Sequence, residues 1–150
     1  MQKTYLLIIL SSSLLFGACS NNAIINPIKP EQLADCPATP NCVSSNQQGF
    51  QNIEPLHIKI PDKNCWEEIV KTVSELPRTT VIINIDGYLK AEVRTLIFRF
   101  TDDLELLLAA DGKTVHIRSA SRLGYSDMGT NGRRIVQLRK ILKDKALIEY

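Results

Sequence analysis

Two Asp-Gly dipeptides, Asp86-Gly87 and Asp111-Gly112, each separate two runs of strand-forming residues, and they constrain the fold more than any other feature. Asp-Gly is favoured in two-residue hairpin turns, where the backbone needs positive φ angles. A further turn is expected at Thr101-Asp102-Asp103. The predicted strands are 79–85, 88–100, 104–109 and 114–121. Strands joined in this way form an antiparallel meander.

Two segments with helical periodicity flank these strands. The first follows Asn64, a candidate N-cap that Glu67 completes as a capping box, and it ends before Pro77. Its apolar stripe is Trp66, Ile69, Val70, Val73 and Leu76. The second follows Asn131, interpreted as its cap, and its stripe is Ile135, Leu138 and Leu142, widened by Val136 and Ile141.

A short strand with alternating apolar residues is expected at 56–60, after a polar loop at 43–52. The order of elements predicts an α+β domain: an antiparallel meander of about four or five strands with two amphipathic helices on one face.

Residues 1–18 are predicted to be a signal peptide, because Lys3 precedes an apolar run that is too short to span a bilayer. The run ends in Gly17-Ala18-Cys19, which resembles a bacterial lipobox. We therefore expect Cys19 to be lipidated; the alternative is an ordinary secretory signal followed by a chance cysteine. Residues 19–35 are interpreted as a lipidated tether and 36–150 as a single globular domain.

Lipidation predicts an exported protein that the N-terminal acyl anchor attaches to the lipid membrane. Because Ser20 rather than Asp follows Cys19, the outer membrane facing the periplasm is expected if the host has two membranes.

Cys36 and Cys42 enclose a short loop that contains two prolines, and an exported protein meets an oxidising compartment. Pairing them would add about 2 kcal/mol of stability. Cys65 is then either a small buried residue at a helix start or a partner for Cys36 or Cys42. With only His57 and His116 and no Cys-x-x-Cys spacing, the sequence predicts no metal site, and it predicts no cofactor.

The stretch from Arg118 to Arg134 is rich in polar residues for a strand-to-helix connection. If Asn131 caps the helix, Arg133 and Arg134 fall in its first turn, where the helix dipole disfavours positive charge. A bound anion would offset this cost. The hypothesis is an anion site made by Arg118, Arg122, Asn131, Arg133 and Arg134, for a phosphate, a carboxylate or a lipid headgroup.

An internal network of carboxylates is the alternative explanation for these arginines. In-register pairing would bring Glu92 and Arg94 near Glu105 and Arg118 on one face of the meander. The supporting network is predicted to contain Glu92, Arg94, Asp102, Asp103, Glu105 and Asp127. Such a network would be structural.

Three functional classes follow from this stretch. The first is a membrane-anchored binding module for an anionic small molecule, and the second is a structural module that contacts another envelope protein. The third is a hydrolase-like or metal-dependent enzyme that uses Asp102, Asp103 and Asp127. The formal net charge of +2 and the aromatic content of 6% do not indicate nucleic-acid binding.

Three blocks of the sequence resemble the domain-of-unknown-function family 1499. They are Cys36-Pro37-x-x-Pro40-Asn41-Cys42-Val43-Ser44-Ser45, the region from Tyr88 to Glu105, and Arg118-Ser119-Ala120-Ser121-Arg122-x-Gly124-Tyr125-Ser126-Asp127-x-Gly129-x-Asn131. One departure is Gly132, where the family usually has arginine. The resemblance implies a domain that folds as a unit in an exported protein, and it implies no particular chemistry.

Overall fold

The computed structural model describes residues 27–149, so the expected signal peptide and Cys19 lie outside the described residues. Its elements are β1 (Cys42–Ser44), a 3-10 turn η1 (Gly49–Gln51), β2 (Leu56–His57), α1 (Lys63–Ser74), β3 (Thr79–Ile85), β4 (Tyr88–Arg94), β5 (Thr101–Leu108), β6 (Thr114–Ser121) and α2 (Thr130–Asp144). Among residues 27–149 no helix is long and apolar enough to cross a membrane. The predicted α+β class is confirmed.

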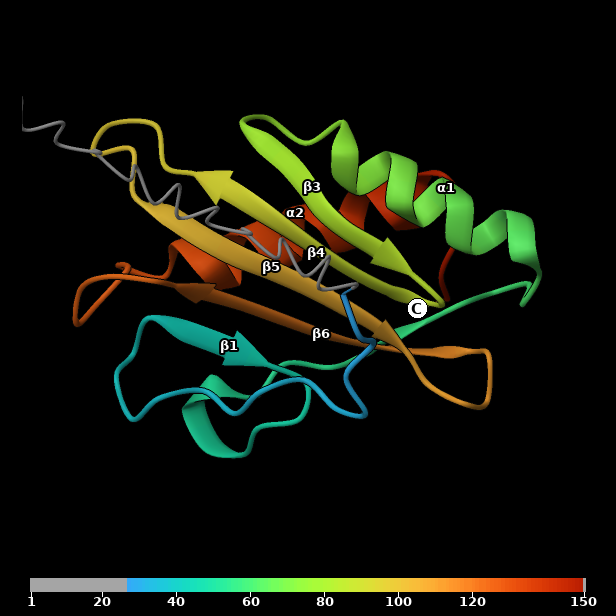
Figure 1. Cartoon of the computed structure of the whole chain (residues 1–150), viewed down its shortest axis with the longest axis horizontal. Helices are drawn as coiled ribbons and strands as arrows, with labels where there is room; N and C mark the ends of the chain where they lie inside the picture. The colour runs from blue at the N-terminus through green and yellow to red at the C-terminus, as the bar shows by residue number, and fades with distance from the viewer. Residues whose placement is uncertain (1–26, 150) are drawn as a thin grey trace, which may run out of the picture.

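The strands form one antiparallel sheet in the order β1-β6-β5-β4-β3, and β2 pairs with β6 beside β1. β3 to β6 are the predicted meander. The main hydrophobic core joins residues of both helices to one face of this sheet, and α2 runs behind the strands in Figure 1. The two helices therefore cover the same face.

The turn between β3 and β4 is the one that the Asp-Gly dipeptide predicts. Asp86 and Gly87 both have positive φ, 42° and 77°. A Cβ on Gly87 would also lie 3.0 Å from Cβ of Leu108, so glycine is required here for space as well as for conformation.

The predicted strand 88–100 is wrong beyond Arg94. The amide of Thr95 donates to the carbonyl of Phe100 (2.9 Å), and this bond closes a loop. Leu96, Ile97 and Phe98 in this loop are exposed. The apolar run predicted a strand because periodicity alone does not distinguish an exposed apolar loop from a buried strand.

The turn expected at Thr101-Asp102-Asp103 is also wrong, because these residues begin β5. Asp102 pairs with Val93 and Ser121, and Asp103 pairs with Glu92 and Ala120. Two adjacent aspartates usually mark a turn. Here the carboxylate of each aspartate forms an ion pair with an arginine, as described below.

Smaller differences lie at element ends. The side chain of Asp62, rather than Asn64, caps α1 by accepting from the amide of Cys65 (2.6 Å). The loop expected at 43–52 contains most of β1 and all of η1. Ile60 and Val136, expected on apolar faces, are 64% and 70% exposed.

The second face of the sheet is partly covered by the N-terminal segment. Leu33, a residue of the expected tether, is buried against Tyr88 and Leu107. Every core residue of the described chain lies between Leu33 and Ile148. A chain that spans residues 20–150 therefore keeps the whole core.

The predicted Cys36–Cys42 disulfide is confirmed, with an S–S distance of 2.05 Å. Cys65 is free and buried at the start of α1, so it is the small core residue of the two alternatives. Its thiol donates to the carbonyl of Leu147 (3.6 Å), and burial raises its pKa.

Removing the disulfide by Cys36→Ala/Cys42→Ala should lower the free energy of unfolding by about 2 kcal/mol, because the unfolded chain regains the freedom of the loop. Urea unfolding of the chain 20–150 measures this change. Chemical reduction of the unmodified chain should give the same shift. An unchanged midpoint would mean that the hydrogen bonds from Gln51 to Pro37 and Thr39 hold the loop alone.

Candidate functional site

The stretch 118–134 forms the end of β6, a loop and the start of α2, and its arginines are divided between the two faces of the sheet. Arg118 and Arg122 pair with carboxylates on the face away from the helices. Arg133 and Arg134 lie in the first turn of α2. The structure therefore does not bring the five predicted anion-binding residues together around one point.

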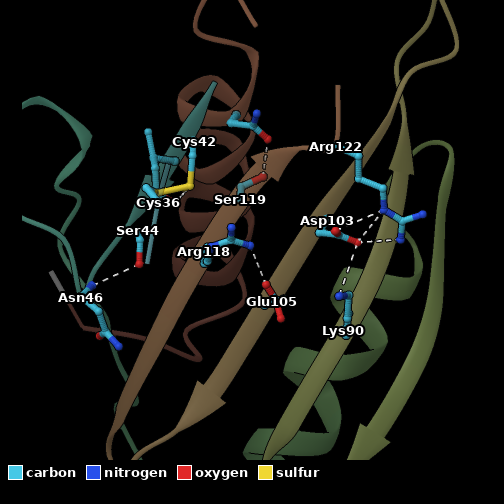
Figure 2. Close-up of polar contacts among 12 residues, drawn as sticks. Cys36, Cys42, Ser44, Asn46, Lys90, Asp103, Glu105, Arg118, Ser119 and Arg122 are labelled. Atoms are coloured by element: carbon cyan, nitrogen blue, oxygen red, sulfur yellow. Dashed lines mark hydrogen bonds and ion pairs between the residues drawn. A yellow bond between two sulfur atoms is a disulfide. The ribbon is translucent and has the colours of Figure 1, made fainter. Parts of the chain in front are cut away.

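On the face away from the helices, the arginines meet carboxylates of neighbouring strands. Nη1 of Arg118 donates to Oε2 of Glu105 (2.8 Å), and the hydroxyl of Tyr88 donates to the other carboxylate oxygen (2.7 Å). Burial and this hydrogen bond raise the pKa of Tyr88. Figure 2 shows the Arg118–Glu105 pair across the two central strands.

A second group on this face is centred on Arg122. Its guanidinium donates to Asp103 (2.8 Å) and to Glu92 (2.6 Å), and these hydrogen bonds raise its pKa. Lys90 lies 3.8 Å from the same Asp103 carboxylate (Figure 2). Arg94, expected in this network, is exposed at the end of β4 and forms none of these pairs.

Backbone amides at the start of α2 have hydrogen-bond acceptors within the same chain. Gly129, with φ of 75°, is the N-cap, so the expectation that Asn131 caps the helix is wrong. The Asp127 carboxylate accepts from the amides of Gly129 (2.9 Å) and Asn131 (2.7 Å). A carboxylate at this position also favours the positive charges of the first turn, because it opposes the helix dipole.

Asp102 and Arg134 form an ion pair buried between the sheet and α2. Nη2 of Arg134 lies 2.5 Å from Oδ2 of Asp102, and the side chains are 11% and 0% exposed. Nη1 of Arg134 donates to Ser119 (2.8 Å) and to Asn131. Because side chains alternate along β5, Asp102 and Asp103 project to opposite faces of the sheet. Two adjacent aspartates in the sequence thus belong to different networks.

Asn131 is fully buried and joins four parts of the chain. Its amide donates to the carbonyl of Asn41 (3.0 Å) and to Ser121 (3.1 Å), and its oxygen accepts from Ser119 (2.6 Å). Asn41, in the disulfide loop, donates to the carbonyl of Gly124 (2.6 Å). Sequence reasoning missed Asn41 and the serines; their only signal was that they stand in the family motifs.

A groove of about 540 Å³ opens at the end of the sheet where these networks stop. It lies between the β4–β5 loop, the β6–α2 loop and the adjoining ends of the helices. The two loops are at the left of Figure 1. Large exposed apolar side chains form its walls: Leu96, Ile97, Phe98, Phe100, Leu123 and Met128. The rings of Phe98 and Phe100 stack with centroids 5.6 Å apart.

The groove also has polar lining residues. Four of them that are buried or half-buried, Asp102, Ser121, Thr130 and Arg134, are called its floor. Oδ1 of Asp102 is buried and has no hydrogen-bond partner among the described residues, although Oδ2 is paired. A buried acceptor without a partner is costly, so this oxygen is an uncompensated polar atom beside the groove.

Two of the three residues proposed for an enzyme lie in one place. Asp102 and Asp127 both line the groove, although the Asp127 carboxylate accepts from the amides at the start of α2, and Asp103 is on the opposite face of the sheet. No group of three or more His, Cys, Asp or Glu residues within 27–149 is arranged to hold a metal ion. The concave, mostly apolar site instead has the form of a binding pocket.

The fold and the groove together define a small α+β domain with a ligand-sized apolar site. A family model described as "Protein of unknown function (DUF1499)" matches residues 32–142, and the chain belongs to this family. No curated protein and no solved structure matches the chain significantly. The match begins just before buried Leu33 and ends at Leu142, so it covers nearly all of the folded core.

Replacing Arg134 by methionine should lower the free energy of unfolding by about 3–5 kcal/mol, because Asp102 would remain buried without its counter-charge. Urea unfolding measures this loss. Adding Asp102→Leu to Arg134→Met should recover part of it. The matched control is Arg122→Met on the open face, which should cost about 1 kcal/mol or less because that pair is partly exposed. Equal losses for the two arginines would contradict the assignment.

Proposed function

We propose that this protein is an exported, lipid-anchored envelope protein whose folded domain binds an amphipathic small molecule in the groove. The observation that carries the proposal is the groove itself, whose large exposed apolar side chains are accompanied by a smaller set of polar lining residues. Sites for small molecules combine these two features, because apolar walls supply affinity and a few polar groups fix orientation.

The exposure of the groove walls supports an occupant. Leu96, Ile97 and Phe98 are each more than 70% exposed, and Met128 on the opposite wall is 86% exposed. Single exposed apolar residues are common on protein surfaces, but a contiguous group of this kind marks an interaction site. An alkyl or aromatic group in the groove would remove part of this surface from water.

The size of the groove fits a small molecule. Its volume of about 540 Å³ lies within the roughly 300–1,000 Å³ of small-molecule sites.

The expected lipid anchor supports a role at the membrane. Acylation of Cys19 would hold the protein on the lipid surface, and the chain from Cys19 to the first described residue, Pro27, spans at most about 28 Å. The groove would therefore remain close to the membrane, where amphipathic molecules are concentrated.

Binding of the neutral apolar dye N-phenyl-1-naphthylamine tests the groove. The dye should fluoresce on adding the chain 20–150, and Ile97→Ser/Phe98→Ser should weaken its binding by about tenfold or more through lost apolar contact. Val136→Ser removes an equally exposed apolar residue from α2, away from the groove, and should change binding little. Equal binding by all three chains would refute the groove as the site.

Cys19→Ala tests the anchor. In host cells fed radiolabelled palmitate, the natural chain should incorporate label and sediment with membranes, because acyl chains on Cys19 partition into lipid. The variant should lose the label. Label that persists in the variant would show that Cys19 is not the lipidated residue.

A further inference from the structure

A second concave region adjoins the groove and has a different chemistry. This hollow, of about 520 Å³, is lined by Arg78, Thr79, Thr80, Arg94, Thr95, Leu96 and Arg99. Five of these residues also line the groove, so the two regions are continuous. The groove is mostly apolar, whereas the hollow presents three arginines and three threonines and no carboxylate.

The arginines of the hollow differ from those of the internal networks. Arg118, Arg122 and Arg134 each contact a carboxylate. No ion pair within residues 27–149 includes any arginine of the hollow, and all three are exposed. A cluster of like charges without counter-charges attracts anions.

Three of the five described non-glycine residues with positive φ line these two regions, and the other two, Asp86 and Ala146, lie elsewhere. Arg78 and Arg99 in the hollow and Met128 in the groove have φ of 58°, 54° and 53°. These are left-handed conformations, which are unfavourable for residues with a Cβ. Strained residues tend to gather at binding sites, where the surrounding structure holds them in place.

We propose that the occupant is an amphipathic anion, with its alkyl chain in the groove and its phosphate or carboxylate headgroup in the hollow. This inference rests on the proposed function and adds the chemical class of the ligand. The guanidinium groups of Arg78, Arg94 and Arg99 would bind the headgroup through charge-assisted hydrogen bonds, which are stronger than neutral ones.

Five probes test this inference on the chain 20–150 by isothermal titration calorimetry. Decyl phosphate, decanoate, decyl maltoside and decyltrimethylammonium share one alkyl chain and differ in headgroup, and inorganic phosphate has no chain. All are used below the concentrations at which they form micelles. The two anionic decyl compounds should bind at least about tenfold more tightly than the neutral and cationic ones. Inorganic phosphate should bind far more weakly than decyl phosphate, because it leaves the groove empty.

The outcomes separate the two proposals. If all four decyl compounds bind equally, the groove binds alkyl chains but the headgroup inference is overturned. If no decyl compound binds, both proposals fail. If inorganic phosphate binds as tightly as decyl phosphate, the hollow is an anion site that does not require the groove, and the inference of an amphipathic ligand is overturned.

A charge-matched pair of variants assigns the effect to the hollow. Arg99→Glu should weaken decyl phosphate binding by about tenfold or more and leave decyl maltoside binding nearly unchanged, because Arg99 lines the hollow but not the groove. Lys113→Glu makes the same change of charge at the exposed β5–β6 turn, at the other end of the sheet, and should leave both nearly unchanged. Both variants must unfold at the same urea concentration as the natural chain. Equal weakening by the two variants would overturn the assignment, because it would show only a long-range effect of net charge.

Discussion

The carboxylate of Asp102 is completely buried, and a charge in that position is tolerated only if a partner and hydrogen bonds surround it. Arg134 supplies the partner from the first turn of α2, and Asn131 and Ser119 hold Arg134 in place. Asn131 in turn binds the carbonyl of Asn41, whose side chain binds the β6–α2 loop at Gly124. The floor of the groove and one of its walls therefore depend on this single ion pair.

The arginines fall into two groups, those paired with carboxylates of the same chain and those in no ion pair among the described residues, and the proposed site for an anionic headgroup rests on the second group. Arg118, Arg122 and Arg134, which dominate the richest stretch of the sequence, are paired with carboxylates of the same chain. The sequence did not single out Arg78 or Arg99, and it predicted Arg94 in the carboxylate network, yet the three share a hollow that contains no carboxylate. Arginines without a carboxylate partner thus lie beside the exposed apolar loops, and the 118–134 stretch contributes one more, Arg133, which lines the groove and donates to Met128 and Thr130.

The parts of the fold that could be predicted from the sequence are those set by local chemistry. The Asp86-Gly87 turn, strands β3 and β6 and the buried stripe of α2 follow from turn preference and periodicity. The predictions failed where distant residues decide. Asp102 lies in a strand because Arg134 neutralises it, and residues 96–100 form an apolar loop because they line a groove. Residues that are adjacent in the sequence indicate neither the pairing of Asp102 with Arg134 nor the groove that residues 96–100 adjoin.

The central claim is that the groove and the hollow hold an amphipathic anion near the membrane. Native mass spectrometry of the full chain released from the membranes of its host tests it most directly, because this measurement needs no assumed ligand. The account predicts a co-purifying anion that carries an alkyl chain and is released when the protein is unfolded. A chain that carries no bound molecule, or only one without an alkyl chain or without an anionic group, would contradict it.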